Sequence, residues 1–198
     1  PIARGVGFKG EYCTTMFNKA RDIILDFFCV LDNDDYTVIY TKSDTEGLNA
    51  LANVLIQDKD DMVLTTRMEH HANDLPFRRV AKMVYVEVDV LGRINIDDIE
   101  EELIKANGKI KVVTITGASN VTGYITPIHD IARLAHKYGA VIIVDGAQLI
   151  AHREVNLAGN SKDEEIDFLT FSAHKAYAPF GSGAIVGKKD YLNEEDPF

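Results

Sequence analysis

The sequence predicts a three-layer αβα protein, in which helices cover both faces of a mostly parallel β-sheet. Segments with apolar residues at helical spacing alternate along the chain with short, apolar, β-branched runs. Strands that are buried on both faces have this continuous apolar character, and their alternation with helices is typical of parallel sheets. Ligands of such sheets bind beyond the carboxyl ends of the strands, so functional residues are expected directly after strands.

The expected elements follow one another along the whole chain. Helical patterns cover residues 15–31, 45–56, 96–107 and 128–138, with Ser43 or Asp44 as cap of the second and Gly139 ending the last. Strand patterns cover residues 36–41, 62–66, 83–88, 110–116, 141–144 and 166–171. Two segments are expected as loops: the stretch with Pro179, Gly181 and Gly183, and the solvated stretch 156–165.

Composition excludes several classes of function. The chain has 198 residues, enough for one substantial domain or two small ones, with 46% apolar residues and a formal charge of -10. This charge disfavours nucleic acid and anionic membranes as partners, because both bind basic surfaces. No apolar run approaches the ~20 residues that cross a bilayer, and no signal peptide is visible.

The cysteine content points to a reducing compartment. Cys13 and Cys29 are the two cysteines, too few for a disulfide framework or a zinc site. Cys29 is expected to pack as a small apolar side chain. The expected location is therefore the cytoplasm.

Lys175 has an unusual position for a lysine. It lies in Ser172-Ala173-His174-Lys175, directly after the apolar strand pattern 166–171. Most lysines are solvated surface charges. An amine at the end of a buried strand, beside a hydroxyl and an imidazole, instead suits the formation of a Schiff base near phosphate ligands.

Two further strand ends carry groups that suit a charged cofactor. Asp145 ends an apolar strand, so its carboxylate needs a partner such as a protonated pyridine nitrogen, unless it caps the next turn. Thr45 and Glu46 open a helix after the strand 36–41. Exposed amides at a helix N-terminus suit a phosphate, although most such residues are ordinary caps.

Histidine and asparagine residues follow two other strands. His70, in Glu69-His70-His71-Ala72-Asn73, suits ring stacking or proton transfer, and Asn120 suits a hydrogen bond to a polar ring substituent. The adjacent histidines lack further ligands at metal-binding spacing, so no metal is predicted. Gly5-Val6-Gly7-Phe8-Lys9-Gly10 has dinucleotide-fingerprint spacing but follows no strand, so we discount it.

Four motifs together resemble one family. They are Glu69-His70-His71-Ala72-Asn73, Ser119-Asn120-Val121-x-Gly123, Val144-Asp145-Gly146-Ala147-Gln148 and Ser172-x-His174-Lys175. In this order and spacing they resemble the class V aminotransferase-fold enzymes that use pyridoxal 5'-phosphate, in particular the cysteine desulfurase/selenocysteine lyase branch. The resemblance extends over nearly the whole chain and implies the fold type I of these transferases.

The resemblance implies a role for each residue. Lys175 is expected to form the Schiff base and move the Cα proton, Asp145 to pair with the pyridinium nitrogen, and His70 to stack on the ring. Gln148 and Asn120 are expected near the phenolic oxygen of the ring. The expected phosphate ligands are Thr45, the Asp44 amide, Ser172 and His174.

The chain also departs from this family. Residues 1–198 are expected to form the pyridoxal-phosphate-binding large domain, incomplete at both ends and without the C-terminal small domain. The persulfide-forming cysteine and the arginine that binds the substrate carboxylate are expected in that missing part. The segment Ser43-Asp44-Thr45-Glu46 replaces the usual Gly-Thr-Thr-Glu or Gly-Ala-Thr-Glu, so Asp44 is expected to weaken phosphate binding.

The resemblance leads to one reading and leaves two alternatives. The leading reading is a cysteine desulfurase, a transferase or lyase that converts cysteine to alanine and passes sulfur to an enzyme cysteine and then to an acceptor protein. A homodimer is expected for the intact enzyme, and the fragment alone is expected to be inactive. The alternatives are another class V aminotransferase, lyase or epimerase, and a catalytically incompetent fragment that serves as an interaction module.

Overall fold

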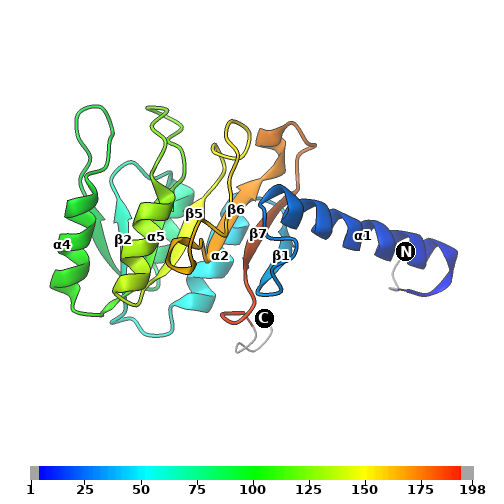
Figure 1. Cartoon of the computed structure of the whole chain (residues 1–198), viewed down its shortest axis with the longest axis horizontal. Helices are drawn as coiled ribbons and strands as arrows, with labels where there is room; N and C mark the ends of the chain where they lie inside the picture. Colours follow the sequence, from blue (N-terminus) through cyan, green and yellow to red (C-terminus); the bar gives the residue numbers. More distant parts are fainter. Residues whose placement is uncertain (1–4, 193–198) are drawn as a thin grey trace.

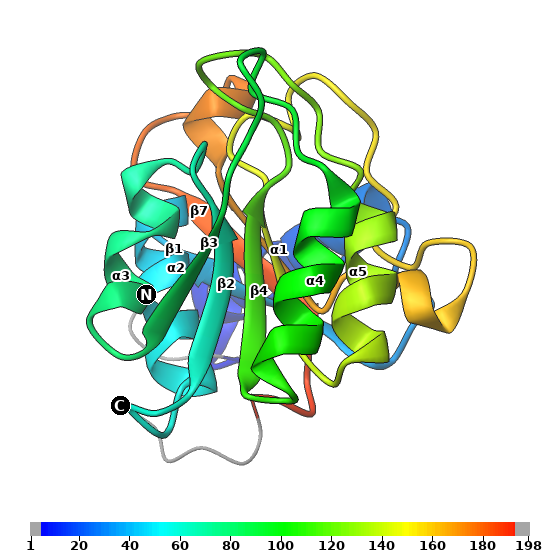
Figure 2. The same cartoon turned by 90° about the vertical axis from the view of Figure 1, so that its left-hand side faces the viewer.

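The structure, a computed structural model, describes residues 5–192 and contains one seven-stranded sheet between layers of helices (Figures 1 and 2). The strands are β1 (Tyr36–Thr41), β2 (Met62–Thr66), β3 (Lys82–Val86), β4 (Ile110–Thr116), β5 (Val141–Asp145), β6 (Phe168–Ser172) and β7 (Gly183–Lys188). The order across the sheet is β1-β7-β6-β5-β4-β2-β3. The predicted fold class is confirmed, and six of the strands were expected within two residues of their bounds.

β7 is the strand that the sequence pattern missed. It runs antiparallel to both β6 and β1, whereas β3, β2, β4, β5 and β6 are parallel. Gly183, expected in a loop, is its first residue. A Cβ atom there would lie 2.5 Å from the Phe171 carbonyl oxygen and 2.9 Å from the Ser43 carbonyl carbon. This glycine therefore serves the close approach of β7 to its neighbours and is no loop signal.

Helices cover both faces of the sheet. The α-helices are α1 (Gly7–Phe27), α2 (Asp44–Leu55), α3 (Leu75–Arg78), α4 (Ile96–Ala106) and α5 (Ile128–Lys137), and three short 3-10 helices are η1 (His71–Asn73), η2 (Lys162–Glu164) and η3 (Ala173–Ala176). Figure 2 shows α4 and α5 on one face and α2 and α3 on the other. Leu103 and Ile131 belong to one apolar core, and Leu51 and Phe77 belong to the other.

α1 projects from the body of the molecule (Figure 1). It begins and ends earlier than the predicted helix 15–31. Phe28 and Val30 bury their side chains after its end, while Cys29 between them is exposed with φ at 60°. The expectation that Cys29 packs in the core is wrong, because the left-handed turn that ends α1 directs this side chain outward.

The stretch 156–165 is held against α5. The Glu164 carbonyl oxygen lies 2.8 Å from His129 Nδ1, the Asp163 carbonyl oxygen lies 2.8 Å from His136 Nδ1, and Arg133 forms an ion pair with the Glu164 carboxylate. Residues 160–163 are exposed to solvent, as predicted, but polar contacts with α5 fix η2 in place. Within residues 5–192, no helix has the length and apolar character that a membrane span requires.

Candidate functional site

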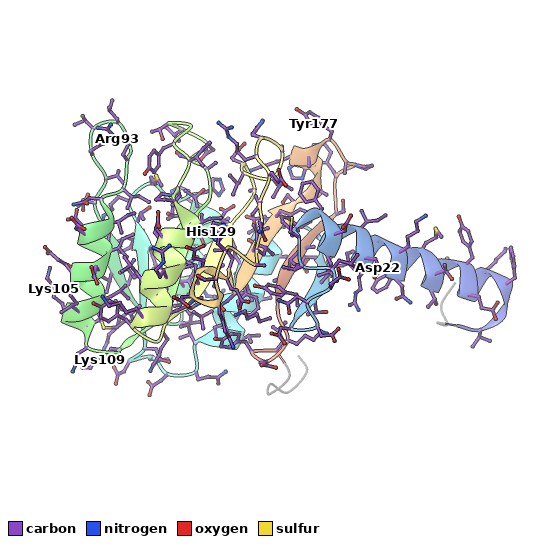
Figure 3. The ribbon with its side chains drawn as sticks, viewed as in Figure 1. Asp22, Arg93, Lys105, Lys109, His129 and Tyr177 are labelled. Atoms are coloured by element: carbon purple, nitrogen blue, oxygen red, sulfur yellow. The ribbon has the colours of Figure 1, made fainter. Side chains whose placement is uncertain are left out.

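The predicted site residues surround one cavity. It has a volume of about 280 Å³ and lies at the carboxyl ends of the parallel strands. Its lining contains all nine predicted cofactor ligands: Asp44, Thr45, His70, Asn120, Asp145, Gln148, Ser172, His174 and Lys175. Five further residues complete it: Ser43, Ala72, Thr116, Ala118 and Ala147. In Figure 3, Tyr177 and Arg93 mark this edge of the sheet, and Lys109, which precedes β4, marks the opposite edge.

The N-terminus of α2 forms one wall of the cavity. Ser43 is its cap, and the Ser43 hydroxyl accepts a hydrogen bond of 3.2 Å from the Glu46 amide. The Glu46 carboxylate in turn accepts from the Lys42 amide at 2.5 Å. This reciprocal capping fixes the first turn of α2, so that its dipole and the nearby Thr45 hydroxyl favour an anion at this place.

Asp44 is buried beneath this helix end, with 5% of its surface exposed. Its amide donates to the Ser172 hydroxyl at 2.8 Å, and its carboxylate oxygen Oδ1 accepts from the Thr170 hydroxyl at 2.5 Å. Burial, followed by the charge of Asp145, raises the pKa of Asp44 to about 7. Asp44 therefore links α2 to β6 through both its backbone and its side chain.

Asp145 forms the floor of the cavity and is 3% exposed. Its Oδ1 accepts a hydrogen bond of 2.9 Å from the Ala147 amide. Among the described residues, no cation lies within ion-pair distance of this carboxylate. Burial raises its pKa, against the Ala147 bond and the more distant charges of Lys175 and His70. The charged carboxylate thus has an unmet need for a cationic partner.

His70 stands at the rim of the cavity, with its ring exposed. Its Nδ1 accepts a hydrogen bond of 3.1 Å from the Ala72 amide, which leaves Nε2 to carry the proton of the neutral ring. The neighbouring His71 does not line the cavity. The accessible ring of His70 can stack on a flat ligand.

Glu69 is a site residue to which sequence reasoning gave no role. Its carboxylate accepts from the Thr66 hydroxyl at 2.6 Å and from the Asn73 side-chain amide at 2.7 Å. The Thr114 hydroxyl donates to Asn73 Oδ1 at 2.5 Å, so the motif that contains His70 is tied to β2 and β4. Burial raises the pKa of Glu69 to about 8. The partners of Glu69 come from β2 and η1, and η1 is in turn bonded to β4, so only the packing of these elements reveals the position of Glu69.

Lys175 approaches the cavity from η3, which follows β6 directly. The ring of His174 stacks on Phe180 with 4.8 Å between centroids, and Tyr177 ends η3 in a left-handed conformation with φ at 67°. Within the described part of the chain, no carboxylate lies within ion-pair distance of the Lys175 amine. Lys175 is thus held beside the cavity without a fixed partner.

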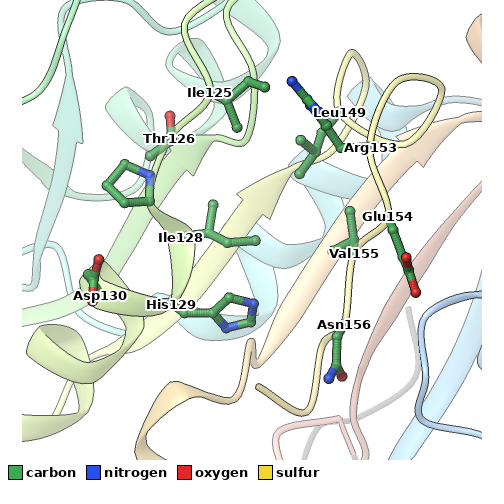
Figure 4. A pocket seen from close by; sticks show the side chains of 11 residues that line it. Ile125, Thr126, Ile128, His129, Asp130, Leu149, Arg153, Glu154, Val155 and Asn156 are labelled. Atoms are coloured by element: carbon green, nitrogen blue, oxygen red, sulfur yellow. The ribbon is translucent and has the colours of Figure 1, made fainter. Parts of the chain in front are cut away.

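A second cavity of about 330 Å³ lies between the start of α5 and the segment after β5 (Figure 4). Ile128, His129, Leu149 and Arg153 line it, and none of the predicted cofactor ligands does. Across residues 5–192, no three His, Cys, Asp or Glu side chains are grouped so as to hold a metal ion. The predicted cofactor ligands thus gather at the cavity between Asp145 and Lys175.

Comparisons with known proteins show the family of this chain. The model of the aminotransferase class V family matches residues 2–198. A probable cysteine desulfurase of Halalkalibacterium halodurans is 33% identical over 99% of this chain and 48% of its own length. A cysteine desulfurase of Haloferax volcanii is 31% identical over 100% of this chain and 46% of its own length.

Solved structures give the same likeness. An apo cysteine desulfurase from Thermococcus onnurineus has a TM-score of 0.85 and 30% identity, and the match covers 98% of this chain and 48% of that one. A cysteine desulfurase from Escherichia coli has a TM-score of 0.79 and 26% identity, over 96% of this chain and 48% of that one. The chain spans about half the length of these relatives.

Proposed function

The chain belongs to the aminotransferase class V family, and from this premise we propose that it is the cofactor-binding part of a pyridoxal-phosphate enzyme. The observation that carries the proposal is the cavity that lies between Asp145, Lys175 and the N-terminus of α2. These three features offer a carboxylate, an amine and an anion site, which are the partners of a pyridine nitrogen, an aldehyde and a phosphate.

The residues of the cavity fit pyridoxal phosphate. The buried Asp145 carboxylate has no cationic partner among the described residues, and a pyridinium nitrogen supplies one. The α2 N-terminus, with the hydroxyls of Thr45 and Ser172, suits the phosphate. His70, Gln148 and Asn120 line the remaining walls, where a ring face and a polar ring edge need contacts.

Each residue then has a definite task. The bound cofactor supplies an electron sink for the carbanion formed at the Cα atom of an amino acid. Lys175 anchors the cofactor through Nζ and, when an amino acid displaces it, takes up the Cα proton at the same atom. Asp145 would pair with the ring nitrogen and hold a proton on it. His70 covers one ring face and keeps water away from it.

We also propose that the whole protein is a cysteine desulfurase that acts in the cytoplasm as a homodimer and passes sulfur to an acceptor protein. The relatives named above support this assignment. Product analysis of the complete protein with cysteine tests it. Alanine and sulfide in equal amounts under reducing conditions are expected, whereas a keto acid product contradicts desulfuration.

Borohydride trapping tests the cofactor site in the chain itself. Pyridoxal phosphate is added, the mixture is reduced, and the adduct is located by peptide mass mapping. We expect the adduct at Lys175 and its loss in Lys175→Arg, while the matched change Lys162→Arg on η2 leaves it in place. A folded protein that gives no adduct at Lys175 contradicts the proposal.

A further inference from the structure

We propose that Asp44 makes anion binding in this cavity proton-linked: the neutral acid admits a phosphate, and the carboxylate opposes it. The inference rests on the proposed function, because the anion it concerns is the phosphate of pyridoxal phosphate. It goes further by assigning a task to a residue at which this chain departs from the sequence usual in its family.

Asp44 and Asp145 both line the cavity, and the charge of Asp145 acts on the carboxyl of Asp44. Thr170, which donates to Asp44 Oδ1 at 2.5 Å, is the register partner of Asp145 in the parallel pair β5 and β6. Register partners in a parallel pair present their side chains on the same face of the sheet. Asp44 and Asp145 are both at least nine-tenths buried. The two acids therefore form a carboxyl pair in one buried site.

The charges around this pair do not compensate two carboxylates and a phosphate. Lys175 and His174 face it from η3, His70 faces it from the loop after β2, and Asp145 stands on β5. On the helix of Asp44 itself, the Glu46 carboxylate turns away to the Lys42 amide. Among residues 5–192, Lys175 is the one amine that lines the cavity. A proton on the carboxyl pair therefore lowers the electrostatic cost of an incoming anion.

The titration of Asp44 falls in the physiological range. Burial and the charge of Asp145 raise its pKa to about 7, although the Thr170 bond and Lys175 act in the opposite direction. A phosphate that binds at the α2 N-terminus adds negative charge close to the Asp44 backbone and disfavours the carboxylate further. Above neutral pH, binding therefore takes up a proton, and affinity falls by up to about tenfold per pH unit.

The test compares pyridoxal phosphate binding by wild type and Asp44→Asn from about pH 6 to pH 9. Asparagine keeps an oxygen that can accept from Thr170 but does not titrate. The ionisations of the cofactor and of Lys175 are common to both proteins, so the difference between the two pH profiles isolates Asp44. We expect the dissociation constant of the wild type to rise at least ~5-fold more than that of the variant.

Two further measurements test whether the phosphate group causes the difference between the pH profiles of wild type and Asp44→Asn. Pyridoxal, which lacks the phosphate, is expected to show a smaller difference between wild type and Asp44→Asn. Calorimetry of pyridoxal phosphate binding in buffers of different ionisation enthalpy is expected to show up to about one more proton taken up by the wild type near pH 8. Asp44→Ala replaces Asp44→Asn if the latter does not fold.

The outcomes separate this inference from the proposed function. Identical pH profiles in wild type and both variants overturn the role of Asp44 and leave the cofactor site standing. An equal Asp44 effect with pyridoxal overturns it as well, because the phosphate is then not the group that Asp44 senses. Failure of folded wild type and variants to bind pyridoxal phosphate at any pH overturns the proposed function and this inference with it.

Discussion

Two buried aspartates lie at opposite ends of neighbouring strands in the sheet. Asp145 ends β5 at the carboxyl edge, and Asp167 precedes β6 at the amino edge. Their exposed fractions are 3% and 1%. The Asp167 carboxylate accepts from the Ile142 amide at 2.9 Å, and it lies 2.9 Å from His136 Nε2 and 3.3 Å from Lys188 Nζ. Asp145 has one amide donor and no cation within ion-pair distance among the described residues.

The difference shows that Asp167 stabilises the fold through its ion pairs, whereas Asp145 is available to bind a ligand. Both ring nitrogens of His136 face acceptor atoms, the Asp163 carbonyl oxygen and the Asp167 carboxylate, and the bond to Asp167 raises the pKa of the ring, which favours the imidazolium. The buried Asp167 carboxylate at the amino ends of the strands is thus paired with two side chains of the protein itself, His136 and Lys188. At the carboxyl ends of the strands, the buried Asp145 carboxylate has no cationic partner among the described residues. This unpaired charge lowers the stability of the fold, and a cationic ligand would restore that stability.

Removing the charge at the amino edge should have the largest effect on stability. Asp167→Asn leaves His136 without its charged partner and Lys188 with the Glu165 carboxylate alone, and we expect the free energy of unfolding to fall by about 3–5 kcal/mol. Denaturant unfolding measures this. The exposed neighbour Asp163→Asn, whose contact with His136 uses its carbonyl, is expected to stay within ~0.5 kcal/mol of wild type. An equal loss in both variants would contradict the comparison.

The equivalent change at the carboxyl edge should act on binding instead. Asp145→Asn is expected to weaken pyridoxal phosphate binding by about 2–5 kcal/mol, because the pyridinium loses its buried partner. Without cofactor, the variant should be more stable than wild type at pH 8. The pKa of Asp145 is raised, so the stability contributed by the acid is lost as pH rises through that pKa. Asp97→Asn, on exposed α4 surface, serves as the control for binding.

A pH titration of stability sharpens the role of His136. Its bond to Asp167 raises its pKa above the usual 6.5. Its contribution to stability is therefore complete below about pH 6.5 and is lost as pH rises through the raised value. His136→Gln should flatten this part of the profile and cost about 1.5–3 kcal/mol at low pH. His152→Gln, at an exposed histidine, should leave the slope unchanged; a parallel change there would argue against the imidazolium.

The smallest effect is expected for an ion pair on the surface. Lys105 lies 2.7 Å from the Glu102 carboxylate on α4, and the two side chains are 61% and 32% exposed to solvent. Lys105→Ala should change the free energy of unfolding by ~0.5 kcal/mol or less. The change in this variant is the reference with which the loss of unfolding free energy in Asp167→Asn is compared. A loss of several kcal/mol at Lys105 would show that ion pairs stabilise this protein irrespective of burial.

The sequence, with the family resemblance of its motifs, predicted the fold class and nine of the fourteen residues that line the cavity. Apolar strands alternate with amphipathic helices, and polar residues follow strand after strand, so a parallel sheet necessarily collects them at one edge. These signals are local. Asp145, Lys175 and Thr45 could be recognised because each directly follows an apolar run or opens a helix.

Only the tertiary structure determines which partners surround each buried carboxylate. Asp44 meets Thr170 across 126 residues and Ser172 across 128, and these bonds exist only because α2 packs on β6. The antiparallel strand β7 and the outward turn at Cys29 also escaped the pattern, since strand order and a single left-handed residue leave no period in the sequence. Hydrogen bonds between distant segments depend on the order of strands, and this order made one buried aspartate structural and left the other free for a ligand.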